Sequence, residues 1–106
     1  MPAAIKSPKA AQAADCLALV QLPNVGPAMA GDLKLLGIHR PADLLGHDAL
    51  QLYRELERRS GQRQDPCVLD TLMAIVDFMH GAPPRPWWHY TAERKRVHGP
   101  LLTKAA

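Results

Sequence analysis

The stretch "LPNVGPAMAGDLKLLGI", residues 22–38, places a turn rich in Pro, Asn and Gly between two apolar runs. Pro23 ends the first run, and Pro27 suits the first turn of a helix because its missing N–H is not needed there. Gly37 is typical of a left-handed helix stop. The pattern predicts two helices joined by a tight corner, and it leaves open whether the corner only packs or also binds phosphate.

The chain of 106 residues has the length of one small domain with its own core. Aliphatic side chains dominate its apolar content and few segments alternate with period two, so we expect an all-α fold. The formal net charge of +3 permits a polyanionic partner but does not require one. Two cysteines without metal-type spacing, no signal-peptide core and no bilayer-spanning run favour a reduced, cytoplasmic protein.

Capping residues set the expected helix boundaries. Asp15 is expected to cap a first helix that Pro23 ends, and Asp48 and Asp65 are expected to cap two later ones. The helix after Asp65 has the most regular apolar spacing, so it is the expected centre of the core. The five expected helices span residues 16–22, 27–36, 41–46, 49–60 and 66–80.

Composition divides the chain into three parts. Residues 1–12 are rich in Ala, Lys and Pro and are predicted to form a flexible tail, whereas residues 13–81 are predicted to form the helical domain. Three prolines favour an extended path for residues 82–106, packed on the domain and with a flexible end. Within this aromatic and basic segment, "ERKR" at 93–96 is expected to form at most one last helical turn.

The corner resembles the helix-hairpin-helix motif of DNA-binding proteins. That family has a Leu-Pro-Gly-hydrophobic-Gly-Pro turn, then a basic residue, then a small residue packed on the first helix. Asn24 replaces the usual Gly, which its tolerance of a left-handed backbone allows, and Ala28 replaces the usual cation. The matching residues are Leu22, Pro23, Val25, Gly26, Pro27 and Ala30.

A glycine turn that leads into a helix leaves backbone N–H groups pointing outward, and with the helix dipole they form a site for a phosphate oxygen. Gly26 lets a nucleic-acid backbone come close, and Val25 is expected to point inward. Such contacts ignore base identity, so binding would be sequence-independent and salt-sensitive. The residues proposed to contact DNA phosphate are Asn24, Val25, Gly26, Ala28, Met29, Lys34, Arg94, Lys95 and Arg96.

A wider resemblance covers most of the chain. Residues 22–38, 43–56, 63–81 and 85–95 are similar to a family of small bacterial proteins known as pathogenicity-locus or mitomycin resistance helix-hairpin-helix proteins. The resemblance implies a five-helix fold like tandem hairpin or SAM-type domains, and it implies little about chemistry. The second helix pair, joined by "SGQRQDP", lacks the Gly-x-Gly turn and is interpreted as a structural partner.

Cys67 would lie in the first turn of a helix, where the dipole lowers a thiol pKa, so one interpretation is a reactive thiol. The other is a buried cysteine beneath a capping Asp, with Arg63 paired to Asp65 or Asp70. We favour the second because no His or other base is spaced to activate the thiol.

The aromatic residues Trp87, Trp88 and Tyr90 either stack on exposed bases, beside Arg85 and "ERKR", or close the bottom of the core. Core packing is favoured because the chain has few other aromatics. The five histidines are scattered without metal-ligand spacing, and no catalytic motif is present. We therefore expect no metal site, no cofactor and no enzymatic activity.

Two functions follow as hypotheses. The first is weak DNA binding without sequence preference, in which the corner supplies backbone donors and residues 94–96 supply positive charge. The family resemblance links this hypothesis to resistance against DNA damage by mitomycin. The alternative is a SAM-like protein–protein interaction module, in which the corner is purely structural and an aromatic patch near Trp87 and Trp88 recruits a protein or a second copy. Neither hypothesis includes a membrane.

Overall fold

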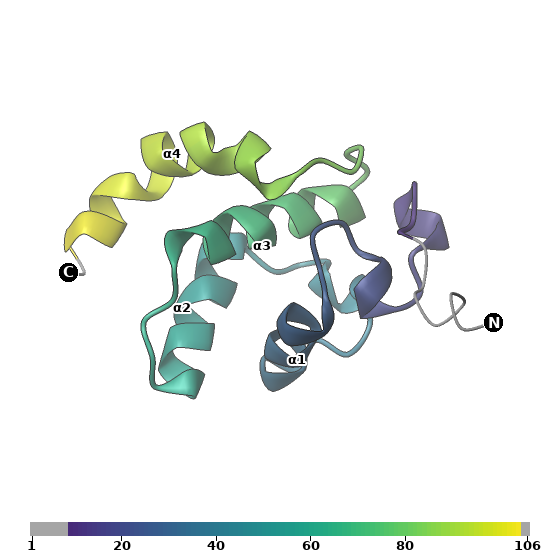
Figure 1. Ribbon diagram of the computed structural model, residues 1–106, viewed down its shortest axis with the longest axis horizontal. Helices are drawn as coiled ribbons and strands as arrows, with labels where there is room; N and C mark the ends of the chain where they lie inside the picture. Colours follow the sequence, from purple (N-terminus) through teal and green to yellow (C-terminus); the bar gives the residue numbers. More distant parts are fainter. Residues whose placement is uncertain (1–8, 105–106) are drawn as a thin grey trace.

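The computed structural model describes residues 9–104, which are helical and contain no strand (Figure 1). It contains four α-helices and four short 3₁₀ turns, so the expectation of five helices is wrong and an all-α fold is confirmed. None of the described helices combines the length and apolar character needed to span a bilayer. The α-helices are α1 (Pro27–Leu35), α2 (Ala49–Ser60), α3 (Pro66–Met79) and α4 (Thr91–Lys104), and the 3₁₀ turns are η2 (Ala13–Asp15), η3 (Leu19–Gln21), η4 (Pro41–Leu44) and η5 (Trp87–Tyr90).

Helix α3 is the centre of the core, as its regular apolar spacing predicts. In Figure 1 it runs between α4 on one side and α1 and α2 on the other. The side chains of Leu69, Leu72, Ile75 and Phe78 on α3 are completely buried. Because these four residues recur at helical spacing, they form one continuous apolar face of α3 against which the other elements pack.

The expected caps form where the sequence places them. Asp48 accepts a hydrogen bond from Gln51 N at 3.1 Å, and Asp65 accepts one from Cys67 N at 3.1 Å. Gly37 adopts the left-handed φ of 85° that lets Ile38 N fold back onto Leu33 O at 2.9 Å. These local interactions fix the ends of α1 and the starts of α2 and α3.

Within the expected first helix over residues 16–22 only the 3₁₀ turn η3 forms, and Asp15 lies inside the preceding turn η2 rather than capping a helix. The N–H groups of Leu17 and Ala18 both donate to Gln21 Oε1 at 2.9 Å, and Ala18 takes an extended conformation. A helix of only two turns has little stability on its own, so hydrogen bonds to the Gln21 side chain are enough to favour a 3₁₀ turn over an α-helix. The corner therefore joins a 3₁₀ turn, rather than an α-helix, to α1.

The C-terminal segment departs most from expectation. An extended path covers only residues 82–86, after which η5 leads directly into α4 at residues 91–104. Residues 92–96 have good helix propensity, and Thr91 and Arg94 are anchored on Asp70 of α3, so tertiary contacts extend what the sequence suggested was one turn. The flexible end expected there falls partly on residues 105 and 106, which lie outside the described residues.

The N-terminal segment is also more ordered than a tail where the structure describes it. Ala10 is buried and its N–H donates to Gln21 O at 2.9 Å, so the predicted flexible tail is wrong for residues 9–12. Residues 1–8 of that predicted tail lie outside the described residues.

Candidate nucleic-acid interface

The corner before α1 depends on an unusual backbone conformation. Asn24 has φ of 69°, and it is the only non-glycine residue with positive φ in the described part of the chain. This confirms that Asn takes the left-handed position where the motif usually has Gly. Val25 follows it with 1% of its side chain exposed, which confirms that this residue points inward and anchors the turn.

The start of α1 is open. Gly26 is the N-cap residue and offers no side-chain acceptor, and Pro27 has no N–H. The first hydrogen bond of the helix runs from Ala30 N to Gly26 O at 2.9 Å, so the N–H groups of Ala28 and Met29 belong to the unpaired first turn. Ala28 is exposed and Met29 is half-buried. Two backbone donors therefore lack a partner within the helix at the positive end of its dipole.

The side chain of Asn24 is committed to another contact. Its Nδ2 donates to Arg85 O at 2.8 Å, and its Oδ1 accepts from Trp87 N at 3.2 Å. The side chain of Asn24 therefore has a structural role, and only its backbone stays a candidate for the predicted phosphate contact. The two bonds fasten the corner to the segment between α3 and α4, which lies beside it in Figure 1.

Lys9 supplies a cation that the sequence analysis missed. Its Nζ donates to Val20 O at 2.8 Å, to Leu22 O at 2.9 Å and to Val25 O. These three bonds use all the donors of the ammonium, so Lys9 has none left for a ligand. It contributes only a positive charge next to the corner. Burial lowers the pKa of Lys9 from its usual value. No local pattern marks it, because it lies 16 residues before Val25 in an Ala- and Pro-rich stretch.

Lys34 lies apart from the corner. It is exposed in the last turn of α1, beside a shallow hollow that Leu19, Val20 and His39 help to line. Seven residues separate it from Pro27, which is about 10 Å along a helix axis. The prediction that Lys34 contributes to the same phosphate site is wrong for a phosphate bound at the first turn.

The three cations of "ERKR" have different environments. Arg94 Nε lies 2.8 Å from Asp70 Oδ1, in an ion pair whose side chains are 13% and 0% exposed. Thr91 Oγ1 donates to Asp70 Oδ2 at 2.8 Å. Arg94 is therefore a structural residue, which corrects its assignment to DNA phosphate. Lys95 and Arg96 are exposed, and neither has an ion-pair partner among the described residues.

The tryptophans are more exposed than the favoured interpretation predicts. Trp88 is 64% exposed and Trp87 is 37% exposed, whereas Tyr90 is buried. Core packing is thus correct for Tyr90 and wrong for Trp88. The rings of Trp87 and Trp88 meet edge to face, with centroids 5.6 Å apart and an interplanar angle of 84°. The η5 turn places the two residues outside the core because Tyr90 and Thr91 occupy the side facing α3.

Cys67 has the environment of a structural thiol. The capping carboxylate of Asp65 lies beside it, and burial followed by the Asp65 contact raises the pKa of the thiol above its usual value. This supports the unreactive interpretation. The expected pairing of Arg63 is wrong, however, because Asp70 pairs with Arg94 and Asp65 bonds the backbone of Cys67.

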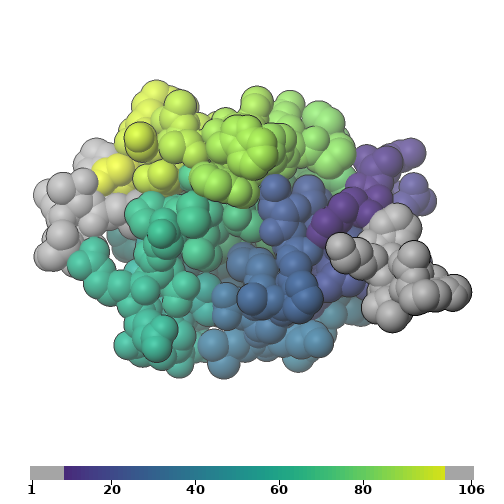
Figure 2. Space-filling model, viewed as in Figure 1, coloured from purple at the N-terminus to yellow at the C-terminus, as the bar shows by residue number. Residues whose placement is uncertain are grey.

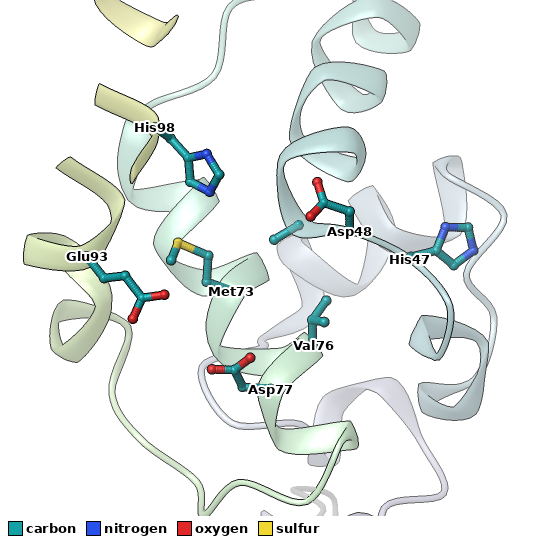
Figure 3. Close-up of a pocket in the computed structure, with 8 residues that line it drawn as sticks. His47, Asp48, Met73, Val76, Asp77, Glu93 and His98 are labelled. Atoms are coloured by element: carbon teal, nitrogen blue, oxygen red, sulfur yellow. The ribbon is translucent and has the colours of Figure 1, made fainter. Parts of the chain in front are cut away.

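A hollow of about 180 Å³ lies between the start of α2, α3 and α4 (Figure 3). In Figure 3, Glu93 and His98 on α4 face Met73 and Asp77 on α3. The hollow is smaller than most small-molecule sites, which measure about 300–1,000 Å³. Across residues 9–104, no three His, Cys, Asp or Glu side chains are arranged to hold a metal ion.

Two comparisons with known proteins point to the same family. Residues 12–96 match the model of the pathogenicity locus (Cdd1) family. A mitomycin resistance protein, McrB, of Streptomyces lavendulae is 48% identical over 79 residues, which cover 74% of this chain and 75% of that protein. No solved structure gives a significant match. The family match covers most of the chain and the sequence identity is high, so the chain belongs to the pathogenicity locus family.

Proposed function

We propose that this protein binds DNA without sequence preference, through the backbone N–H groups of Ala28 and Met29 at the open start of α1. The observation that carries the proposal is the absence of any side-chain cap on this helix, behind a turn that matches the helix-hairpin-helix pattern. Unpaired donors at a helix N-terminus favour a phosphate oxygen. On this proposal the domain is of the helix-hairpin-helix, SAM-like type.

The surroundings of the corner favour an anion. Gly26 is exposed, and a Cβ built on it would meet no atom within 4 Å, so no protein atom covers the position next to the donors. Lys9 places a positive charge behind the turn, which partly replaces the cation missing at Ala28. Lys95 and Arg96 add exposed charge on α4. Because these groups read no base, affinity should fall steeply as salt rises.

The Streptomyces relative is named for mitomycin resistance, and we propose a related role for this chain in the bacterial cytoplasm. A protein that binds the DNA backbone without regard to sequence is suited to cover DNA that a drug has modified. On this proposal the protein acts by binding rather than by catalysis, and a partner or a second copy increases the affinity of a single corner.

The test is a fluorescence-anisotropy titration of a labelled duplex at low and high salt. Gly26→Glu places a carboxylate beside the donors and is expected to reduce duplex affinity at least about tenfold, as like-charge repulsion replaces attraction. Gly31→Glu is the matched control, since Gly31 is exposed in the middle of α1 with open space around it. Equal affinities of wild type and Gly26→Glu, with both proteins folded, would refute a phosphate site at the corner.

The exposed tryptophan pair favours a second candidate function, a protein–protein interaction module. Apolar association depends weakly on salt, whereas DNA binding depends on it strongly. A self-association or partner complex that persists at high salt, together with no DNA binding at low salt, would support this candidate instead.

A further inference from the structure

The C-terminal segment carries the whole positive balance of the chain. Residues 82–106 contain five Lys and Arg side chains and one acidic residue, whereas residues 1–81 contain eight and nine respectively. The segment also contains both tryptophans. Figure 2 shows α4 and the turn before it along one edge of the molecule. The basic and aromatic character of the chain is therefore concentrated on one element.

The inner side of this element is used for packing. The η5 turn leads directly into α4, so residues 87–104 form one continuous helical segment. Tyr90 is buried, and Thr91 and Arg94 are both bonded to Asp70 at 2.8 Å. These contacts hold the segment on α3 and fix which of its sides faces outward.

The outer side combines an exposed indole with free cations. Ala92, Lys95 and Arg96 are three and four residues apart and lie along one side of α4, and Trp88 lies in η5, four residues before Ala92. All four are exposed. Neither Lys95 nor Arg96 has a hydrogen-bond or ion-pair partner in the part of the chain that the structure describes.

The indole of Trp88 is held in place by its neighbours. Trp87 packs against it at a right angle, and the backbone of Trp87 is bonded to Asn24 in the corner. Pro83, Pro84 and Pro86 restrict the segment that precedes it. A base can therefore stack on Trp88 without first having to order a mobile loop, which lowers the entropic cost of binding.

We propose that this outer face binds single-stranded DNA, with an unpaired base stacked on Trp88 and phosphates at Lys95 and Arg96. Single strands are the substrate class because bases in a duplex already stack on one another, whereas an unpaired base leaves its face free for an aromatic ring. We favour a nucleic acid over an apolar protein partner because two exposed cations, Lys95 and Arg96, follow the exposed tryptophans along the segment and have no ion-pair partner among the described residues. The inference rests on the proposed DNA-binding function and names its substrate class.

The test compares a labelled oligo(dT) with a duplex of equal length at low salt. Trp88→Leu keeps an apolar side chain but removes the aromatic face, and it is expected to weaken oligo(dT) binding about tenfold and to leave duplex binding unchanged. Trp88→Phe should bind oligo(dT) within about threefold of wild type. Leu45→Ala, at an exposed leucine between η4 and α2, is the control for loss of apolar surface elsewhere.

A second readout reports stacking directly. The chain has two tryptophans, so Trp87→Phe leaves Trp88 as the sole indole. Its fluorescence should be quenched by oligo(dT) and not by duplex. Lys95→Gln with Arg96→Gln should weaken oligo(dT) binding and lower its salt dependence, because two phosphate contacts are lost.

The outcomes separate this inference from the proposed function. Weaker oligo(dT) binding in Trp88→Leu, together with duplex binding unaffected by Gly26→Glu, supports the Trp88 site and refutes the corner. The Trp88 site is overturned if Trp88→Leu binds oligo(dT) as tightly as wild type, or if oligo(dT) does not quench the fluorescence of Trp88. The effect of Gly26→Glu on duplex affinity then tests the corner independently. Self-association that Trp88→Leu abolishes, with oligo(dT) binding unchanged, would also overturn the Trp88 site and would assign the patch to a second copy.

Discussion

Helices α1 and α3 both begin with proline, but one start is open and the other is closed. At α1 the N-cap is Gly26, which leaves the donors of the first turn to the solvent. At α3 the N-cap is Asp65, whose carboxylate accepts from Cys67 N. A cap that carries a negative charge satisfies a donor and repels an anion. The start of α3 is therefore a structural joint, whereas the start of α1 is the phosphate site that we propose.

The difference extends beyond the first turn. The buried charge of α3, on Asp70, is neutralised by Arg94 and bonded by Thr91. At the start of α1, Lys9 instead bonds the carbonyl of Val25, and Asn24 bonds the carbonyl of Arg85. These bonds anchor the corner to other segments, and neither one caps the first turn of the helix. Helix α3 thus organises the fold, and the start of α1 is available for a partner.

The largest expected effect concerns the buried charge of α3. Arg94→Met leaves the Asp70 carboxylate buried without its cation, and we expect it to lower the free energy of unfolding by about 3–5 kcal/mol. Arg96→Met is the matched control, because Arg96 is exposed and its loss should cost less than about 0.5 kcal/mol. Urea denaturation measures both. Similar values for the two variants would show that the ion pair does not hold α4 on α3.

The second prediction converts the open start into a closed one. Gly26→Asp gives α1 the kind of cap that α3 has, and the φ of −106° at this position suits any residue. We expect duplex DNA affinity to fall about tenfold while the protein becomes as stable or slightly more stable, since Asp caps a helix better than Gly. Anisotropy and thermal melting are measured on the same samples. Unchanged affinity with a raised melting temperature would mean that the open start is not used for DNA.

The third prediction removes the cap of α3. Asp65→Ala should lower the melting temperature by a few degrees without changing DNA affinity, because the lost bond lies at a structural joint. The bond from Cys67 N holds the pKa of Asp65 below its usual value of 3.8. The stabilisation by this carboxylate is therefore complete above about pH 4 and is lost as the pH falls through the lowered pKa. The difference in melting temperature between the two proteins should shrink over that range, and a constant difference would contradict the role of the ionised cap.

The smallest effect is on the thiol of Cys67. Its raised pKa keeps it protonated at neutral pH, so alkylation by iodoacetamide should be slower than that of a free thiol and should accelerate above about pH 9. Asp65→Asn removes a neighbouring negative charge and should speed the reaction modestly. Peptide mapping by mass spectrometry separates Cys67 from Cys16, which is buried. Rapid alkylation of wild type at pH 7 would restore the hypothesis of a reactive thiol.

Local signals predicted the regular elements well. The caps at Asp48 and Asp65, the left-handed Gly37 and the core spacing of α3 depend on neighbours within a few residues, which a sequence reader can see. The first helix and the C-terminal segment were mispredicted, because Gln21 and Asp70 make contacts there that propensity does not include.

The features of the candidate site also fall into those that the sequence predicts and those that depend on the tertiary structure. The sequence by itself determined the all-α class, the open corner with Gly26 and Pro27, and the family to which the chain belongs. Only the tertiary structure decided that Lys9 stands behind the corner, that Arg94 is buried while Arg96 is free, and that Trp88 faces the solvent. The physical reason is that a cap or a turn is made by residues close along the chain, whereas burial and ion pairing depend on which distant segments the fold brings together.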